Sequence, residues 1–282
     1  MIYAPLISHS EGISGVALSP YAMGRTTPRI SYIPIEPPSM SLRETLQHRR
    51  AIRYYDPEKP LDSARVEECL RQATLAPTSS NMQLYRCYHI TDPTIIAALT
   101  PACLGQSTIS TAKEVVVFAI TPSRWRERVD HLFPRIVEDI HKHQPEEKWA
   151  KYEAMQREYM TKVVPFLYSR GCKVWGWARH LVMNAIALFR PMMRQGTEGD
   201  MKTVLHKSCA LVAQTFMLAM SEAGYDTCPV EGFDARRVRK ALGLPSSIEP
   251  SLIVSCGIRD EKRPLGGRIR VPFESVYERI GK

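Results

Sequence analysis

The sequence predicts a protein of the α+β class, because it contains both short strand-like runs and longer capped helical segments. The first run alternates apolar and polar residues, as a half-buried strand does, and the others suit strands covered on both faces. The three runs are residues 86–91, 115–120 and 251–258. Helices are expected near residues 41–50, 62–76, 203–223 and 234–242.

Residues with capping chemistry indicate where these helices begin and end. Ser41 and Glu44 have the spacing of a capping box, in which each side chain binds an otherwise unpaired backbone N–H. The second helix begins near Asp62 and places four apolar residues on one face: Val66, Cys69, Leu70 and Ala73. Gly224 and Gly243 close the last two helices, since glycine readily adopts the left-handed cap.

Residues 122–202 separate a predicted buried strand from the helix expected after it, and we interpret them as a helical insertion. Their first half is highly charged, and Pro145 suits a first helical turn. Residues 174–193 are rich in Trp and Met, but polar and charged residues disfavour a transmembrane helix: Arg179, His180, Asn184 and Arg190. The proline-rich residues 1–40 predict an extended arm, and residues 41–282 the main domain.

Composition argues against several classes of function. The formal net charge of +9 fits phosphate ligands or nucleic acid, but the basic residues are mixed with acids and no nucleic-acid-reading module is present. The seven cysteines are scattered without a C-x-x-C pair, which predicts reduced thiols in a cytoplasmic protein. We therefore expect no nucleic-acid partner, no metal site and no secretory signal.

Four separated motifs contain residue types that suit a planar, phosphorylated ligand. Residues 49–53 end the first helix with guanidinium groups, whose forked donors match phosphate oxygens. Residues 76–85 form a loop of hydroxyls and amides, and residues 228–234 include Gly232, which permits close backbone approach. Residues 268–270 place two arginines on one face if the segment is extended.

Each motif has a plainer interpretation when it is taken alone. The first fits charge at a helix C-terminus, and the second fits an ordinary helix-to-strand turn. The third fits a helix–helix connection with Asp234 as N-cap, and the fourth fits a solvated basic tail.

Taken together, the motifs resemble the nitroreductase family of FMN enzymes. The matching patterns are R-R-x-x-R-x-[YF]-D from Arg49, A-P-[ST]-S-x-N-x-Q from Ala76 and P-[VI]-E-G-F-D from Pro229. The resemblance covers residues 41–120 and 203–282 and leaves the arm and the insertion unmatched. It implies a mostly antiparallel sheet flanked by helices, and a homodimer with exchanged terminal segments and two FMN sites at its interface.

The resemblance also implies roles for individual residues. Four arginines would hold the flavin phosphate: Arg49, Arg50, Arg268 and Arg270. Arg53 would lie near the flavin N1 and O2, Gln106 near the pyrimidine edge, and the backbone of Glu231 and Gly232 near N5. The partner chain would supply Thr78, Ser79, Asn81 and Gln83. Neighbouring residues complete the predicted site: Ala51, Pro77, Pro229 and Val230.

Two residues depart from the family pattern. Ala51 stands where many relatives have serine, which removes one phosphate donor. The pair Leu84-Tyr85 replaces the common Pro-Trp and mostly alters packing.

If the resemblance holds, a hydride passes from NADPH or NADH through FMN to an electron-poor small molecule such as a nitroaromatic or a quinone, in a ping-pong cycle. No catalytic side chain is predicted, because the cofactor does the chemistry. The insertion is expected to act as a lid, with four aromatic residues as candidate substrate contacts: Phe166, Tyr168, Trp175 and Trp177. There are two alternatives for this segment. The aromatic residues could form the insertion's own core, or the helix could lie on a membrane surface and admit a lipophilic quinone.

Two other functions fit the same residues. One is an FMN enzyme with different redox chemistry, such as a reductive dehalogenase or a substrate oxidase. The other is a flavin-binding protein whose turnover is blocked by the insertion. No residue pattern distinguishes NADPH from NADH, because this fold has no G-x-G-x-x-G signature to read.

Overall fold

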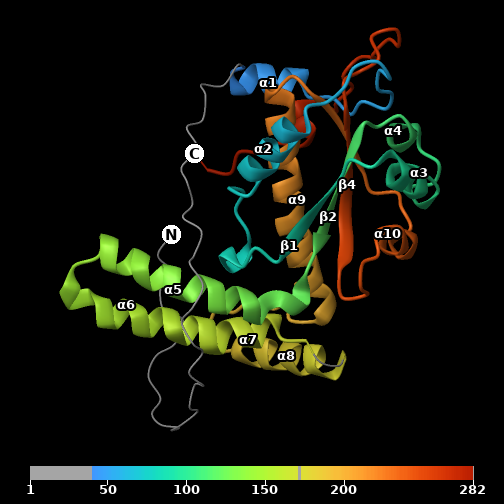
Figure 1. The fold of residues 1–282 in the computed structure, drawn as a ribbon. Helices are drawn as coiled ribbons and strands as arrows, with labels where there is room; N and C mark the ends of the chain where they lie inside the picture. Colours follow the sequence, from blue (N-terminus) through green and yellow to red (C-terminus); the bar gives the residue numbers. More distant parts are fainter. Residues whose placement is uncertain (1–39, 171–172, 282) are drawn as a thin grey trace, which may run out of the picture. The chain divides into compact units, whose positions relative to one another are not determined.

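The computed structural model describes residues 40–170 and 173–281 (Figure 1). The predicted arm therefore lies almost entirely outside the described residues. The described residues divide into two compact units: residues 42–122 with 203–281, here called the sheet unit, and residues 40–41 with 123–170 and 173–202, here called the insertion unit.

A four-stranded sheet forms the centre of the sheet unit. The strands are β1 (Tyr85–Ile90), β2 (Glu114–Ile120), β3 (Asp226–Val230) and β4 (Glu249–Gly257), in the order β1-β2-β4-β3. All three neighbouring pairs are antiparallel. The predicted α+β class and the antiparallel sheet are confirmed. Every residue of β2 is buried, as its unbroken apolar sequence predicted.

Strand β3 was not predicted, since residues 228–234 fit a connection between two helices. Cys228, Pro229 and Val230 instead pair with β4. Proline cannot donate to a strand ladder, but β3 lies at the edge of the sheet, where an outward-facing position needs no donor. The edge position therefore explains how a strand accommodates Pro229.

Helices cover both faces of this sheet. They are α1 (Leu42–His48), α2 (Ser63–Ala73), α3 (Pro93–Ala102), α4 (Ser107–Ser110), α9 (Glu198–Glu222) and α10 (Ala235–Ala241). One face packs against α3 and α10 in a buried apolar cluster that includes Val115, Val117 and Val238. The other face packs against α9 (Figure 1). The rings of Phe118 and Phe216 lie 5.6 Å apart in this contact.

The helix boundaries follow the capping residues with few exceptions. Asp62 accepts a hydrogen bond from the Ala64 N–H at 2.9 Å and begins α2 as predicted. Helix α1 ends two residues earlier than expected, and α9 begins five residues earlier. Helices α3 and α4 were not predicted, although Asp92 as N-cap and Pro93 in the first turn are the usual signals for α3.

The insertion unit is helical, as predicted. It contains α5 (Trp125–His143), α6 (Glu146–Glu158), a π-helical turn (Tyr159–Val163), α7 (Val164–Tyr168) and α8 (Lys173–Ile186). Pro145 directly precedes α6. Among the described helices, none is both long and apolar enough to cross a membrane.

A buried carboxylate joins two strands to a helix at one end of the sheet. Glu114 begins β2, and its carboxylate lies 2.6 Å from His89 Nε2 on β1 and accepts a hydrogen bond from the Ser63 hydroxyl of α2. Burial raises the pKa of Glu114, but the hydrogen bonds from His89 and Ser63 outweigh burial and hold it below its usual 4.5.

This lowered pKa predicts an acid-dependent loss of stability. A carboxyl group whose pKa is lower in the folded state stabilises the fold above its unfolded pKa, and that contribution is lost as the pH falls. In unfolding experiments between about pH 6 and pH 3, we expect Glu114→Gln to lose less stability on acidification than the wild type. At neutral pH the variant should be less stable by about 1–3 kcal/mol. Glu67→Gln, on the exposed side of α2, is the control, and parallel pH curves for Glu114→Gln and wild type would contradict the assignment.

Candidate functional site

Residues 49–56 run along the outer edge of β3. Ala51 forms a parallel bridge with Thr227, and the Ile52 N–H donates to the Thr227 carbonyl at 3.1 Å. Further along, the Asp56 N–H donates to the Ile258 carbonyl at 2.8 Å. The sheet thus fixes the backbone that follows α1.

Buried hydrogen bonds hold the same segment from inside. The Tyr55 hydroxyl lies 2.8 Å from Ser255 Oγ and 3.0 Å from the Ser255 carbonyl oxygen. Thr108 Oγ1 lies 2.6 Å from Ser255 Oγ and donates to the Ile52 carbonyl at 3.2 Å. Burial raises the pKa of Tyr55 well above its usual value, so the phenol stays neutral and able to donate. Because Ile52 and Tyr55 are buried, Arg53 is left on the surface.

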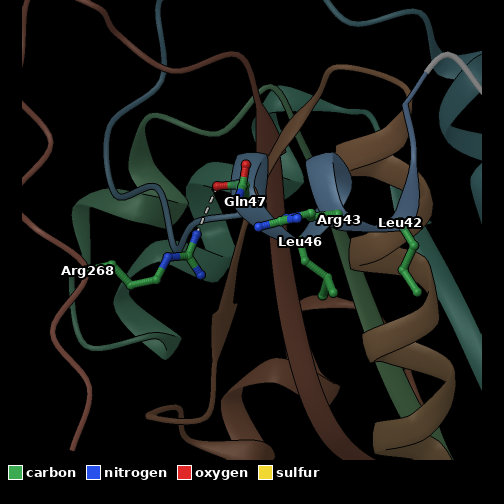
Figure 2. Close-up of a pocket in the computed structure, with 5 residues that line it drawn as sticks. All are labelled: Leu42, Arg43, Leu46, Gln47 and Arg268. Carbon is green, nitrogen blue, oxygen red and sulfur yellow. Dashed lines mark hydrogen bonds between the residues drawn. The ribbon is translucent and has the colours of Figure 1, made fainter. Parts of the chain in front are cut away.

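Four arginines lie together at the start of this segment, two from the segment itself and two from the C-terminal residues 268–270. Arg49 is half-buried, and its pKa is lowered by burial and by the positive charges of Arg268, Arg270 and Arg50. Arg268 donates to the carbonyls of Gln47 and Arg49, both at 2.9 Å (Figure 2). Arg50 donates to the Gly266 carbonyl at 2.7 Å.

No carboxylate of the described residues forms an ion pair with any of these four arginines. Positive charge is therefore concentrated without a counter-ion, and an anion would relieve the repulsion. An open cavity of about 540 Å³ lies next to Arg268 on α1, lined by Leu42, Arg43, Leu46, Gln47 and Arg268 (Figure 2). The two leucines give this cavity an apolar wall beside the charged cluster.

Two further predicted residues meet beyond the end of β3. Gln106 Nε2 donates to the Gly232 carbonyl at 2.9 Å and to the Cys103 carbonyl at 3.0 Å. This fixes the amide orientation and leaves Oε1 without a donor among the described residues. Glu231 and Gly232 are exposed, so their backbone is open to a ligand.

The loop of residues 76–85 lies elsewhere in the sheet unit. It leads into β1, and strands β2 and β4 separate β1 from β3, a span of roughly 14 Å at the usual strand spacing. Within one chain, Thr78, Ser79, Asn81 and Gln83 are therefore not brought to the arginines. Three non-glycine residues of the loop have a positive φ: Ser80 (55°), Asn81 (52°) and Gln83 (48°).

The predicted substrate residues all lie in the insertion unit. Tyr168 is buried and Phe166 is partly buried, whereas Trp175 and Trp177 are 41% and 62% exposed. The Trp175 indole N–H donates to Ser169 Oγ at 3.1 Å. Their role as substrate contacts stays a prediction.

A polar network that the sequence did not suggest holds the end of α1. Arg259 forms an ion pair with the buried Asp226, and its Nη2 lies 3.2 Å from His48 Nε2. His48 Nδ1 lies 3.0 Å from the Ser221 hydroxyl, which donates to the Thr45 carbonyl at 2.9 Å. Burial lowers the pKa of His48, which favours the neutral ring that can accept from Arg259. The network positions the backbone immediately before Arg49.

Comparisons with known proteins agree on one family. A family model described as "Nitroreductase family" matches residues 46–258. A candidate NAD(P)H nitroreductase of Bacillus subtilis, YdgI, is 26% identical over 238 residues, covering 83% of this chain and 95% of the relative.

Solved structures agree with this result at the level of the fold. The candidate nitroreductase ydfN of B. subtilis has a TM-score of 0.64 at 17% identity, covering 84% of this chain and 98% of its own. A candidate nitroreductase of Exiguobacterium sibiricum, solved in complex with FMN, has a TM-score of 0.59 at 21% identity. The match covers 85% of this chain and 97% of the E. sibiricum chain.

The close contact between Tyr55 and Gly257 predicts a sensitive position. A Cβ atom at residue 257 would overlap the Tyr55 ring, so Gly257→Ala should force Tyr55 away from Ser255. We expect a loss of about 1–3 kcal/mol in the free energy of unfolding, measured by denaturant titration. Gly199→Ala is the control, because its Cβ would make only an ordinary contact at 3.7 Å and should cost little. Equal stability of the two variants would show that Tyr55 is not held as described.

Proposed function

The chain belongs to the nitroreductase family, and we propose that it is an FMN-dependent oxidoreductase that uses NADPH or NADH to reduce an electron-poor acceptor such as a nitroaromatic or a quinone. The observation that carries the proposal is the cluster of Arg49, Arg50, Arg268 and Arg270 without a carboxylate partner. The relative described as an NAD(P)H nitroreductase and the structural neighbour with FMN support this choice of donor and cofactor.

The chemistry of the cluster fits the flavin phosphate. A phosphate dianion accepts several charge-assisted hydrogen bonds, and guanidinium groups present paired donors with matching geometry. Arg49 is partly desolvated, which strengthens its interaction with an anion. Ala51 offers no hydroxyl donor, so the guanidinium groups would carry the phosphate affinity.

The residues beyond β3 fit the other end of the cofactor. Gln106 Oε1 can accept from a flavin N–H, and the exposed backbone N–H groups near Glu231 and Gly232 can donate to ring heteroatoms. Arg53, on the exposed side of its segment, would stabilise negative charge near the pyrimidine ring.

FMN, when bound, would supply the redox chemistry by accepting a hydride from the reduced nicotinamide and passing it to the acceptor. This chain's residues would bind the phosphate, orient the ring and stabilise charge. They need to supply neither a nucleophile nor a general acid.

A second copy of the chain would complete the site. The polar loop before β1 lies at the opposite edge of the sheet from the arginines. The C-terminal residues leave apolar side chains exposed, among them Ile269 (87%), Val276 (73%) and Ile280 (93%). Both features support a homodimer in which the tail packs on the partner and the partner's loop faces the flavin.

The proposal predicts that the arginines discriminate FMN from riboflavin. Arg49→Ala and Arg268→Ala should each weaken FMN binding about tenfold or more, because each removes a charge-assisted hydrogen bond. Riboflavin, which has no phosphate, should bind these variants and the wild type alike in fluorescence titrations. Arg86→Ala, on an exposed part of β1, is the control and should bind FMN normally. Equal losses for FMN and riboflavin would place the arginines outside the phosphate site.

The purified protein provides the direct test of the cofactor and the reaction. We expect an FMN spectrum, rapid bleaching by NADPH or NADH under anaerobic conditions, and recovery of the colour with a nitroaromatic or a quinone. A protein that cannot be reconstituted with FMN would refute the cofactor. Recovery only with a halogenated substrate, or reduction of the flavin by an organic substrate alone, would favour the alternative redox chemistries.

Mixed dimers test whether two chains share each site. One chain would carry Arg49→Glu and the other Asn81→Asp, since aspartate tolerates the positive φ at that position. In a shared site, the heterodimer keeps one intact site and should bind about half the normal FMN, whereas both homodimers bind poorly. If each site comes from one chain, the heterodimer will bind no more FMN than the homodimers.

A further inference from the structure

Helix α8 of the insertion unit has its polar and apolar sides reversed relative to an ordinary surface helix. Its buried side carries Gly176, Arg179 and Met183. Arg179 is only 1% exposed, although its side chain carries a positive charge. A helix of a globular protein normally buries its apolar stripe and exposes its charges.

The contacts of Arg179 fix this orientation. Its guanidinium group donates to the Gly196 carbonyl at 2.6 Å and to the Leu167 carbonyl at 2.9 Å, and it lies 3.8 Å from the Glu198 carboxylate. The inner side chain is therefore hydrogen-bonded to α7 and to the segment before α9, and it forms an ion pair with the start of α9. Gly176 permits this close packing, because a Cβ there would lie 2.8 Å from the Glu198 nitrogen.

The opposite side of α8 is apolar and open. Val174, Trp177 and Leu181 are 71%, 62% and 66% exposed, and their spacing of three and four residues puts them on one face. Leu188 (75%) and Phe189 (89%), in the turn that follows the helix, are exposed as well. From residue 174 to 186 the face is roughly 18 Å long at the rise of an α-helix. An exposed contiguous apolar surface of this kind marks an interaction site.

The charge around this face indicates what it binds. Residues 159–197 contain no Asp or Glu, but three of their six basic residues form ion pairs with the acids at either end: Lys162 with Glu158, and Arg170 and Arg179 with Glu198. The other three basic residues are Lys173, Arg190 and Arg194. Arg190 and Arg194 follow directly after the helix and are exposed. Exposed apolar side chains with tryptophan, next to the exposed Arg190 and Arg194, have the chemistry of a segment that lies in the interface of an anionic lipid layer.

We infer that the exposed face of α8, with residues 187–194, binds the surface of an anionic membrane. The helix lies parallel to the surface, with Trp177 and Leu181 entering the boundary between head groups and acyl chains. The exposed Arg190 and Arg194 complement the negative charge of such a surface. The inference is independent of the proposed redox function, because binding to vesicles requires neither FMN nor turnover.

Vesicle co-sedimentation of the whole 282-residue chain tests this inference. We expect binding to vesicles of phosphatidylcholine with phosphatidylglycerol, weaker binding to phosphatidylcholine alone, and a decrease with added salt. Leu181→Glu should lower the vesicle affinity about tenfold or more. Leu75→Glu is the matched control, because Leu75 is also an exposed leucine (78%) but lies in the sheet unit, and it should bind as the wild type does.

Tryptophan fluorescence supplies a second readout. Anionic vesicles should shift the emission of the wild type to shorter wavelength, and the shift should disappear in Trp177→Gln while the melting temperature is unchanged. Wild-type protein that stays in the supernatant with anionic vesicles would overturn the inference. So would a change in oligomeric mass in Leu181→Glu without any vesicle binding, because the face would then be a contact between protein chains.

Discussion

The hydrogen bonds of the buried Tyr55 hydroxyl are the constraint on which the candidate site depends. Tyr55 reaches Ser255 in the centre of the sheet unit, and Thr108 joins Ser255 to the carbonyl of Ile52. These contacts hold an otherwise irregular segment against the edge strand and leave its arginines together. Like charges repel, so a flexible segment would separate them. A rigid segment keeps them close, so the anion that we propose would meet a site that is already organised.

The fold could be predicted where local chemistry determines it. Asp62 begins a helix because its carboxylate caps a free N–H, and the unbroken apolar run of residues 115–120 reads as a strand covered on both faces. Strand β3 could not be predicted, because Pro229 argues against a strand unless the strand is known to lie at an edge. Edge position is a property of the assembled sheet, and no local pattern contains it.

In the candidate site, too, the residues of compact motifs could be predicted and the long-range contacts could not. The arginines at residues 49–53 and 268–270 were found because each motif is compact in the sequence and resembles a family pattern. The network of Asp226, Arg259 and His48 was not found, because His48 and Arg259 are 211 residues apart and each is unremarkable alone. The reversed polarity of α8 could not be predicted either. The sequence indicates an amphipathic helix but does not show which side faces inward.

The loop before β1 has a consequence for how this protein could change. Ser80, Asn81 and Gln83 hold left-handed backbone conformations that glycine would adopt without strain. Each such residue lowers the free energy of unfolding by on the order of 1–3 kcal/mol. The polar side chains of this loop therefore reduce the stability of the fold. Selection for heat resistance alone would drive these positions toward glycine, and at Asn81 and Gln83 it would remove groups that are expected to touch the ligand. Under the proposed function, stability and activity would therefore oppose each other in this loop.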